Sequence, residues 1–245
     1  MKRLLAFLAA SGALTSAAAG EPGLANEIYR PGVERGETEF ELRGGVLDGG
    51  AHGGEWQLKA EYSHAFTDWW RPGLVGEWER ESGNGRFTAF ALENVFDFTA
   101  TRDWPVHLGG YFEYEWKQSG DEEVEAKVLA EHVRGPFALT LNLIAQREIG
   151  SGAVWEFGYA AEAAYKLNDD FALGVQGLGD AGAEDSVGDF GDQAHYWGPF
   201  AQFELAHLGE GEIEAQLGYL VGSGEAEADG QFRFKLEYEF GRACR

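Results

Sequence analysis

The sequence contains very little sulfur. Cysteine occurs once, at Cys244, and methionine occurs once, at Met1. A monomer can therefore form no internal disulfide and no thiolate metal cluster, and a copper-handling surface rich in thioether ligands is excluded. The 6 histidines stand singly along the chain, with no close pair that would predict a metal site. We expect neither a metal nor a cofactor.

Basic residues are also scarce. The chain has 19 lysines and arginines against 42 aspartates and glutamates, which gives a formal net charge of −23 at pH 7. Binding to nucleic acid depends on Lys and Arg side chains that neutralise phosphates, so we expect no nucleic-acid partner. A chain with this excess of acid attracts cations instead.

Long apolar runs are absent after the first twenty residues. The basic pair Lys2 and Arg3 is followed by an uncharged, apolar stretch that ends in three alanines at residues 17–19. This order predicts a secretory signal peptide over residues 1–19, because a membrane anchor would need a longer apolar run. No later stretch reaches about 18 apolar residues, so the sequence predicts no transmembrane helix.

The rest of the sequence alternates between apolar and polar residues. In "QFRFKLEYEF", residues 231–240, every second residue is apolar and those between are polar or charged. On a helix these apolar residues would scatter around the axis, whereas on a β-strand they share one face. The pattern recurs and predicts twelve strands, near residues 37–47, 54–65, 70–81, 86–98, 104–117, 123–133, 137–148, 153–166, 171–180, 194–206, 212–222 and 231–240.

The connections between these strands alternate in length. Tight turns such as "FTDW", "VRGP" and "LNDD" lie between longer loops such as "KQSGDEE" and "GSGEAEADG", which are rich in glycine and acid. Short turns on one rim and longer loops on the other are typical of outer-membrane barrels. We expect one barrel domain over residues 20–240, followed by a short tail at 241–245.

An apolar face on nearly every strand fits either the core of a soluble sandwich or a lipid bilayer. The large aromatic residues favour lipid, because they lie at strand ends. Trp69 and Trp104 fall near the short-turn rim, and Trp116 and Trp197 fall near the long-loop rim. Two such girdles place amphipathic rings at the lipid headgroups, whereas a sandwich would bury its aromatics mid-core. The predicted fold is all-β: a single antiparallel, up-and-down transmembrane β-barrel of about 12 strands in contact with outer-membrane lipid.

The stretch "FRFKLEYEF" resembles the C-terminal signature of Gram-negative outer-membrane proteins. In that class the barrel-insertion machinery reads the signature, so the resemblance implies this role for Tyr238 and Phe240. The sequence departs from the pattern in that "GRACR" follows Phe240. The layout as a whole is also similar to small twelve-stranded transporter-like barrels.

The polar faces of the strands are predicted to line a lumen. A surplus of carboxylates there cannot all pair within the protein and would need water or cations, and acidic rings select cations. The alternative is that polar lumens are always charged and the excess has no specific role. The predicted lining residues are Glu61, Glu77, Glu79, Glu113, Glu115, Glu125, Glu131, Glu156, Glu162, Glu214, Lys59, Lys127, Arg233 and Lys235.

The sequence therefore predicts an outer-membrane channel or transporter for small solutes, with a lumen that favours cationic or neutral species. One alternative is a non-conducting barrel with a structural or surface-interaction role. Another is a barrel-embedded lipid hydrolase, which needs Ser and His within hydrogen-bond reach of each other. Ser63 and His64 are adjacent on a predicted strand and so point to opposite faces. We expect no catalytic residues.

Overall fold

The computed structural model describes residues 23–81, 83–100, 102 and 104–241. The predicted signal peptide and Cys244 lie outside the described residues. None of the helical structure in the described part of the chain is long and apolar enough to cross a bilayer.

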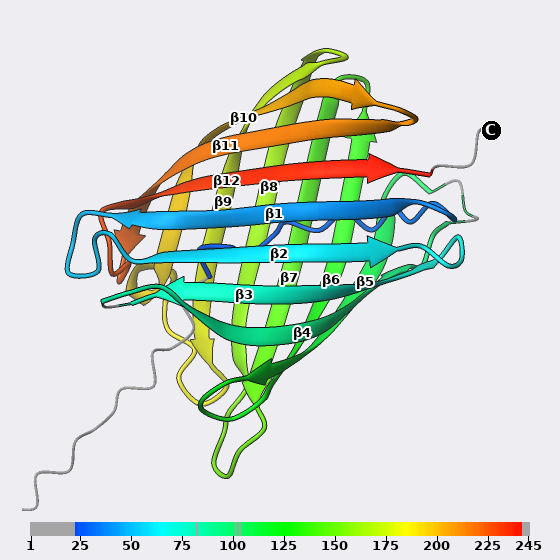
Figure 1. Ribbon diagram of the computed structural model, residues 1–245. Helices are drawn as coiled ribbons and strands as arrows, with labels where there is room; N and C mark the ends of the chain where they lie inside the picture. The colour runs from blue at the N-terminus through cyan, green and yellow to red at the C-terminus, as the bar shows by residue number, and fades with distance from the viewer. Residues whose placement is uncertain (1–22, 82, 101, 103, 242–245) are drawn as a thin grey trace, which may run out of the picture.

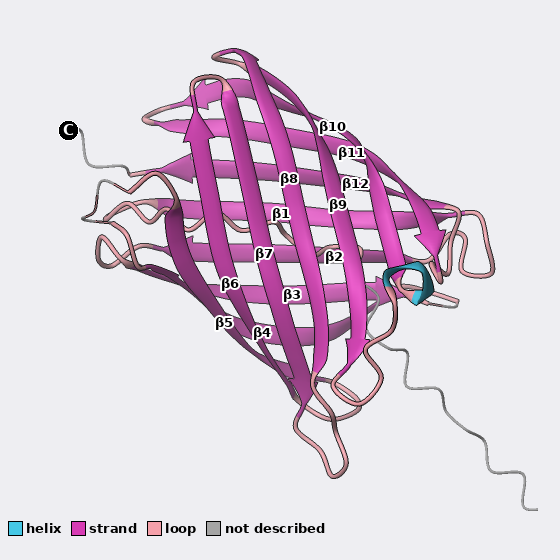
Figure 2. Cartoon of the chain, turned by 180° about the vertical axis from the view of Figure 1, so that it is seen from behind, coloured by secondary structure: helices cyan, strands magenta, loops and turns pink. Residues whose placement is uncertain are grey.

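Within the described residues, twelve antiparallel strands form one closed barrel, in which each strand pairs with its sequence neighbours and β1 pairs with β12. Figures 1 and 2 show this wall from opposite sides. The predicted fold class is confirmed. The strands are β1 (Thr38–Asp48), β2 (Trp56–His64), β3 (Trp70–Arg80), β4 (Arg86–Asp97), β5 (His107–Lys117), β6 (Glu123–Arg134), β7 (Phe137–Glu148), β8 (Glu156–Asn168), β9 (Phe171–Ala183), β10 (Ala194–Leu208), β11 (Gly211–Gly224) and β12 (Gly230–Phe240), with one short 3-10 helix, η1 (Phe190–Asp192), before β10.

The first and last strands close the barrel along their full length. The pairing runs from Thr38 opposite Phe240 to Asp48 opposite Gly230. Closure leaves no strand with unpaired backbone N–H and C=O groups along an edge, which is the condition for a sheet in hydrocarbon.

The outer face of the wall is apolar and solvent-exposed in the isolated chain. Val128 and Leu217 are each 58% exposed, and Phe40 on β1 is 49% exposed. On the strands, these exposed residues lie on the face that the alternating pattern predicts to be apolar. A continuous apolar surface of this extent is not stable in water, so lipid must cover it.

The residues before β1 lie inside the barrel. Residues 23–37, here called the N-terminal segment, run along the lumen behind β1 and β2 in Figure 1. Ala25 and Tyr29 are each only 1% exposed. The sequence predicts a barrel domain from residue 20 onward but does not predict that its first part fills the lumen.

Two inward glycines make room for the N-terminal segment. A Cβ on Gly45 would lie 2.9 Å from the carbonyl oxygen of Leu24, and one on Gly109 would lie 2.7 Å from the Cβ of Pro31. At both positions the added Cβ would also lie within 2.8 Å of a carbonyl oxygen on a neighbouring strand. Any larger residue at either position would push the segment or the wall aside.

Candidate functional site: the lumen

The N-terminal segment divides the lumen into three levels. A loop-side cavity of about 360 Å³ lies toward the rim of the longer loops. A turn-side cavity of about 420 Å³ lies toward the rim where β1 begins. Asn26 borders both cavities. Between them the segment packs against the wall in a central layer.

Arg43 on β1 is the cation at the centre of a network of ion pairs in the central layer. Its side chain is 5% exposed, and its guanidinium lies 2.5 Å from Glu41 and 2.6 Å from Glu61. The same group lies 3.1 Å from Glu93 and 3.5 Å from Glu27 of the N-terminal segment. One buried cation thus meets carboxylates from three strands and the segment. Buried charges are tolerated only with such partners.

Tyr29 fixes the N-terminal segment to the wall. Its backbone N–H donates to Oδ1 of Asn142 at 2.7 Å, and Nδ2 of Asn142 donates to its carbonyl oxygen at 2.8 Å. The hydroxyl of Tyr29 donates to Glu93 at 2.7 Å. Its ring lies 4.5 Å from the ring of Tyr111 and 4.7 Å from Nζ of Lys127. A single side-chain amide therefore satisfies both backbone groups of Tyr29, as a neighbouring strand would.

Apolar side chains complete the central layer. They form two clusters that each include or contact the N-terminal segment, which supplies Ile28, Tyr29 and Val33. The wall residues are Ala65, Val95, Tyr111 and Leu129 in one cluster, and Ile144, Ala160, Leu178, Tyr196 and Leu220 in the other. The lumen is therefore not polar throughout. Burying these groups together stabilises the segment in its place.

The turn-side cavity is lined by both the wall and the segment. Its lining has nine carboxylates and five cationic side chains. Arg30 of the segment lies 3.6 Å from Glu131 and 3.6 Å from Glu162. Lys235 of β12 lies 3.2 Å from Glu27. These ion pairs link the segment to opposite sides of the wall.

The lining of the loop-side cavity has a larger excess of carboxylates over cationic side chains than that of the turn-side cavity. Strands β2 to β7 and the start of the segment line it with eight carboxylates and three cationic side chains. Nζ of Lys59 lies 3.0 Å from Glu77, and Nζ of Lys117 lies 2.8 Å from Glu123. Lys117 also lies 3.6 Å from Glu148, and Lys127 lies 3.0 Å from Glu125. Half of the eight carboxylates therefore have an ion pair, and half have none with the described residues.

Most residues predicted to line the lumen border one of these cavities. The loop-side set is Lys59, Glu77, Glu79, Glu113, Glu115 and Glu125. The turn-side set is Glu131, Glu162, Glu214, Arg233 and Lys235. Glu156 borders a small hollow beside Asn26. Glu61 and Lys127 belong to the central layer, where they pair with Arg43 and Glu125.

Sequence reasoning missed the central layer. Leu129 and Leu178 are fully buried inside the barrel, although the predicted lining was polar. A signal for them exists, because each interrupts the alternation of its strand, as in "KVLAE" and "QGLGD". An apolar residue on the polar face of a barrel strand indicates that something apolar fills the lumen at that level.

The structure does not bring the adjacent serine and histidine together. Ser63 is buried on the inward face of β2. His64 is hydrogen-bonded through Nδ1 to the hydroxyl of Thr38, at 2.8 Å. Tyr238 and Phe240 stack on the outer face of β12, with ring centroids 5.1 Å apart. Their role in insertion stays a prediction.

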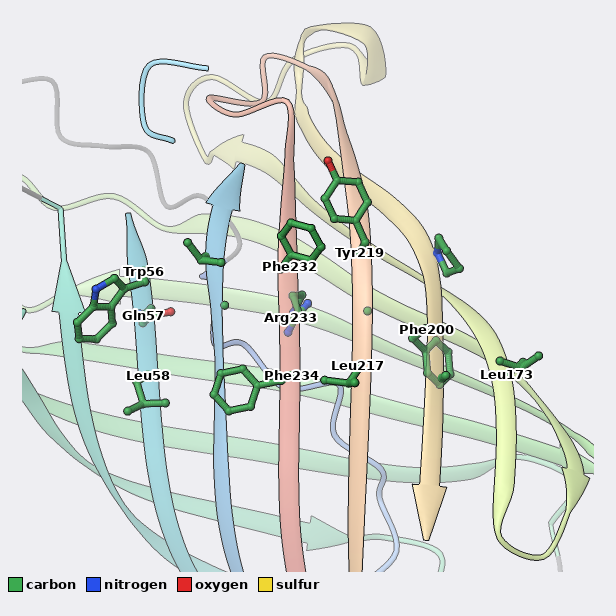
Figure 3. A pocket seen from close by; sticks show the side chains of 15 residues that line it. Trp56, Gln57, Leu58, Leu173, Phe200, Leu217, Tyr219, Phe232, Arg233 and Phe234 are labelled. Carbon is green, nitrogen blue, oxygen red and sulfur yellow. The ribbon is translucent and has the colours of Figure 1, made fainter. Parts of the chain in front are cut away.

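A groove of about 820 Å³ lies on the outer face. Figure 3 shows its lining side chains on neighbouring strands, among them Trp56, Leu58, Leu217, Phe232 and Phe234. All five belong to the apolar outward set. The groove is therefore part of the lipid-facing surface and not part of the lumen.

Comparisons with known proteins identify the fold. No family model and no curated protein matches the sequence. The NanC porin aligns with a TM-score of 0.56 at 10% identity, over 82% of this chain and 98% of that chain. The KdgM porin aligns with a TM-score of 0.54 at 10% identity, over 82% of this chain and 98% of that chain. An outer membrane channel from Pseudomonas putida F1 aligns with a TM-score of 0.59 at 14% identity, over 85% of this chain and 96% of that chain.

The fold is that of an outer-membrane β-barrel. At these identities the similarity concerns the fold alone. Together with the apolar outer face, it confirms the predicted location in an outer membrane. The predicted layout of a small transporter-like barrel is supported at the same level.

Proposed function

We propose that the protein is an outer-membrane channel for small solutes and that it favours cationic or neutral species. The observation that carries this proposal is a closed barrel with a polar cavity toward each rim, of about 360 and 420 Å³. Carboxylates outnumber cationic side chains in both linings. Such a lining raises the local concentration of cations and disfavours anions.

The solute of a fold neighbour is not carried over. One solved structure of the KdgM porin is described as a complex with oligogalacturonate, an oligomer of a sugar acid. The identity to this chain is 11%, which concerns the fold alone. The acidic lining here argues against an anionic solute, since like charges repel in a narrow, partly desolvated path.

Reversal potential in planar bilayers tests the proposal. With the purified chain in a potassium chloride gradient, we expect current steps whose reversal potential is shifted toward the equilibrium potential of potassium. The double variant Glu162→Gln/Glu214→Gln removes two carboxylates of the turn-side cavity and should shift the reversal potential toward zero. No current steps at any voltage, or a reversal potential shifted toward the equilibrium potential of chloride, would contradict the proposal.

A non-conducting barrel with a structural role is the second candidate. The observation that favours it is the filled central layer, where Arg43, Tyr29 and the two apolar clusters occupy the lumen. The same recordings separate the candidates, because a structural barrel gives no current steps.

A further inference from the structure

The loop-side cavity contains carboxylates that its own cations do not neutralise. Glu79, Glu113 and Glu115 border the cavity and form no ion pair with any described residue. Glu79 accepts a hydrogen bond from the Gln57 amide at 2.9 Å, and Glu113 accepts one from the Tyr111 hydroxyl at 2.8 Å. Both donors are neutral, so neither supplies a positive charge to its carboxylate.

Glu115 is the least satisfied of the three. It is only 8% exposed, its side chain borders the cavity, and it has neither a hydrogen bond nor an ion pair within the described part of the chain. Its cross-strand partner on β6 is another carboxylate, Glu123. A buried carboxylate without a partner is unfavourable, and a like charge directly opposite adds to the cost. Lys59, the lysine that acts electrostatically on Glu115, is already paired with Glu77 at 3.0 Å, so Glu115 has no cation of its own among the described residues.

The arrangement does not suit a single metal ion. Among the described residues, carboxylate oxygens converge within 4.8 Å in two trios, Glu27–Glu41–Glu61 and Glu39–Glu41–Glu237. Neither trio borders the loop-side cavity. A calcium ion needs several oxygens around one point at about 2.3–2.6 Å. The acids of this cavity are instead spread along its wall, which suits a ligand with separated positive groups.

We propose that the loop-side cavity binds linear polyamines, that is, alkyl chains carrying two or more ammonium groups. Glu115 is the direct partner of one ammonium group, and Glu79 and Glu113 accept hydrogen bonds from another. An ammonium group has three N–H donors and no acceptor, so it matches carboxylates that have no cationic neighbour. The proposal rests on the channel function and names a class of solute for it.

Isothermal titration calorimetry on the folded full chain in detergent tests the site directly, with spermidine as the probe. Binding should be measurable for the unaltered protein and at least about tenfold weaker for Glu115→Gln, which loses a charge-assisted hydrogen bond. The matched control is Asp169→Asn, which also removes one carboxylate charge but borders neither cavity and has a side chain that is 98% exposed. Its affinity should change by less than about twofold, since exposed charges contribute little. Heat-dependent gel migration verifies that each variant is folded.

Three results would overturn the polyamine site: no binding by the folded protein, equal affinity of Glu115→Gln, or tighter binding of magnesium than of spermidine at equal charge concentration. Bilayer recordings on the same preparations keep the two proposals apart. Current without spermidine binding refutes the site and supports the channel. Spermidine binding without current supports the site and refutes the channel.

Discussion

At the residue scale, opposed carboxylates are the unusual feature of this barrel. Glu41 on β1 lies opposite Glu61 on one side and Glu237 on the other. Like charges directly across a strand pair are destabilising. Arg43 and Lys235 offset these pairs, at 2.5 and 3.3 Å from Glu41. Alternating glutamates in the sequence predict an acidic inner face, but which cation neutralises which acid depends on the register across strands.

Replacement of Arg43 should be strongly destabilising. Arg43→Met leaves several buried carboxylates without their cation, and breaking such a buried network costs roughly 3–5 kcal/mol. Urea titration followed by heat-dependent gel migration measures the change. The control is Lys166→Met, which removes an ion pair to Asp169 whose side chains are 57% and 98% exposed. Equal stability of the two variants would contradict the assigned role of Arg43.

At the scale of elements, the strands follow from alternation and the N-terminal segment does not. The prediction for residues 137–148 matches β7 (Phe137–Glu148), and that for 231–240 differs from β12 by one residue. The strand predicted from residue 104 begins at His107 because Pro105 has no N–H for the ladder.

The N-terminal segment could not be placed from the sequence, because it has no strand periodicity and its contacts are remote. Tyr29 binds Asn142, which is 113 residues away. Individual side chains far apart in the sequence make these contacts, so no local sequence pattern predicts them. The inward glycines and the buried Leu129 indicate that the lumen is occupied, but not by which part of the chain.

An arginine on the outer face of β7 tests the assignment of that face to lipid. Leu141 lies in the middle of the strand and Phe137 at its start, and both are exposed, at 41% and 56%. Leu141→Arg should destabilise the barrel in lipid by about 2–4 kcal/mol, whereas Phe137→Arg should cost about 0–1 kcal/mol. Unfolding in phospholipid vesicles measures both. No dependence on depth would contradict a membrane-spanning strand.

At the scale of the whole molecule, the protein combines an acid-lined barrel with an internal segment of its own chain. The acidic lumen was predictable from composition and alternation. That pattern does not show whether the lumen is hydrated along its full length. In the structure, Arg43, Tyr29 and two apolar clusters fill the centre. Under the proposed channel function, the route for solutes is set by how closely the segment packs against the wall.

Single-channel conductance with and without residues 23–33 of the N-terminal segment tests this account most directly. The two proteins are the full chain and a variant lacking residues 23–33, both verified as folded by heat-dependent gel migration and recorded in the same potassium chloride solution. The account predicts a larger single-channel conductance for the shortened chain, because its two cavities join into one aqueous path. Equal conductance of the two proteins, or no current from either, would contradict it.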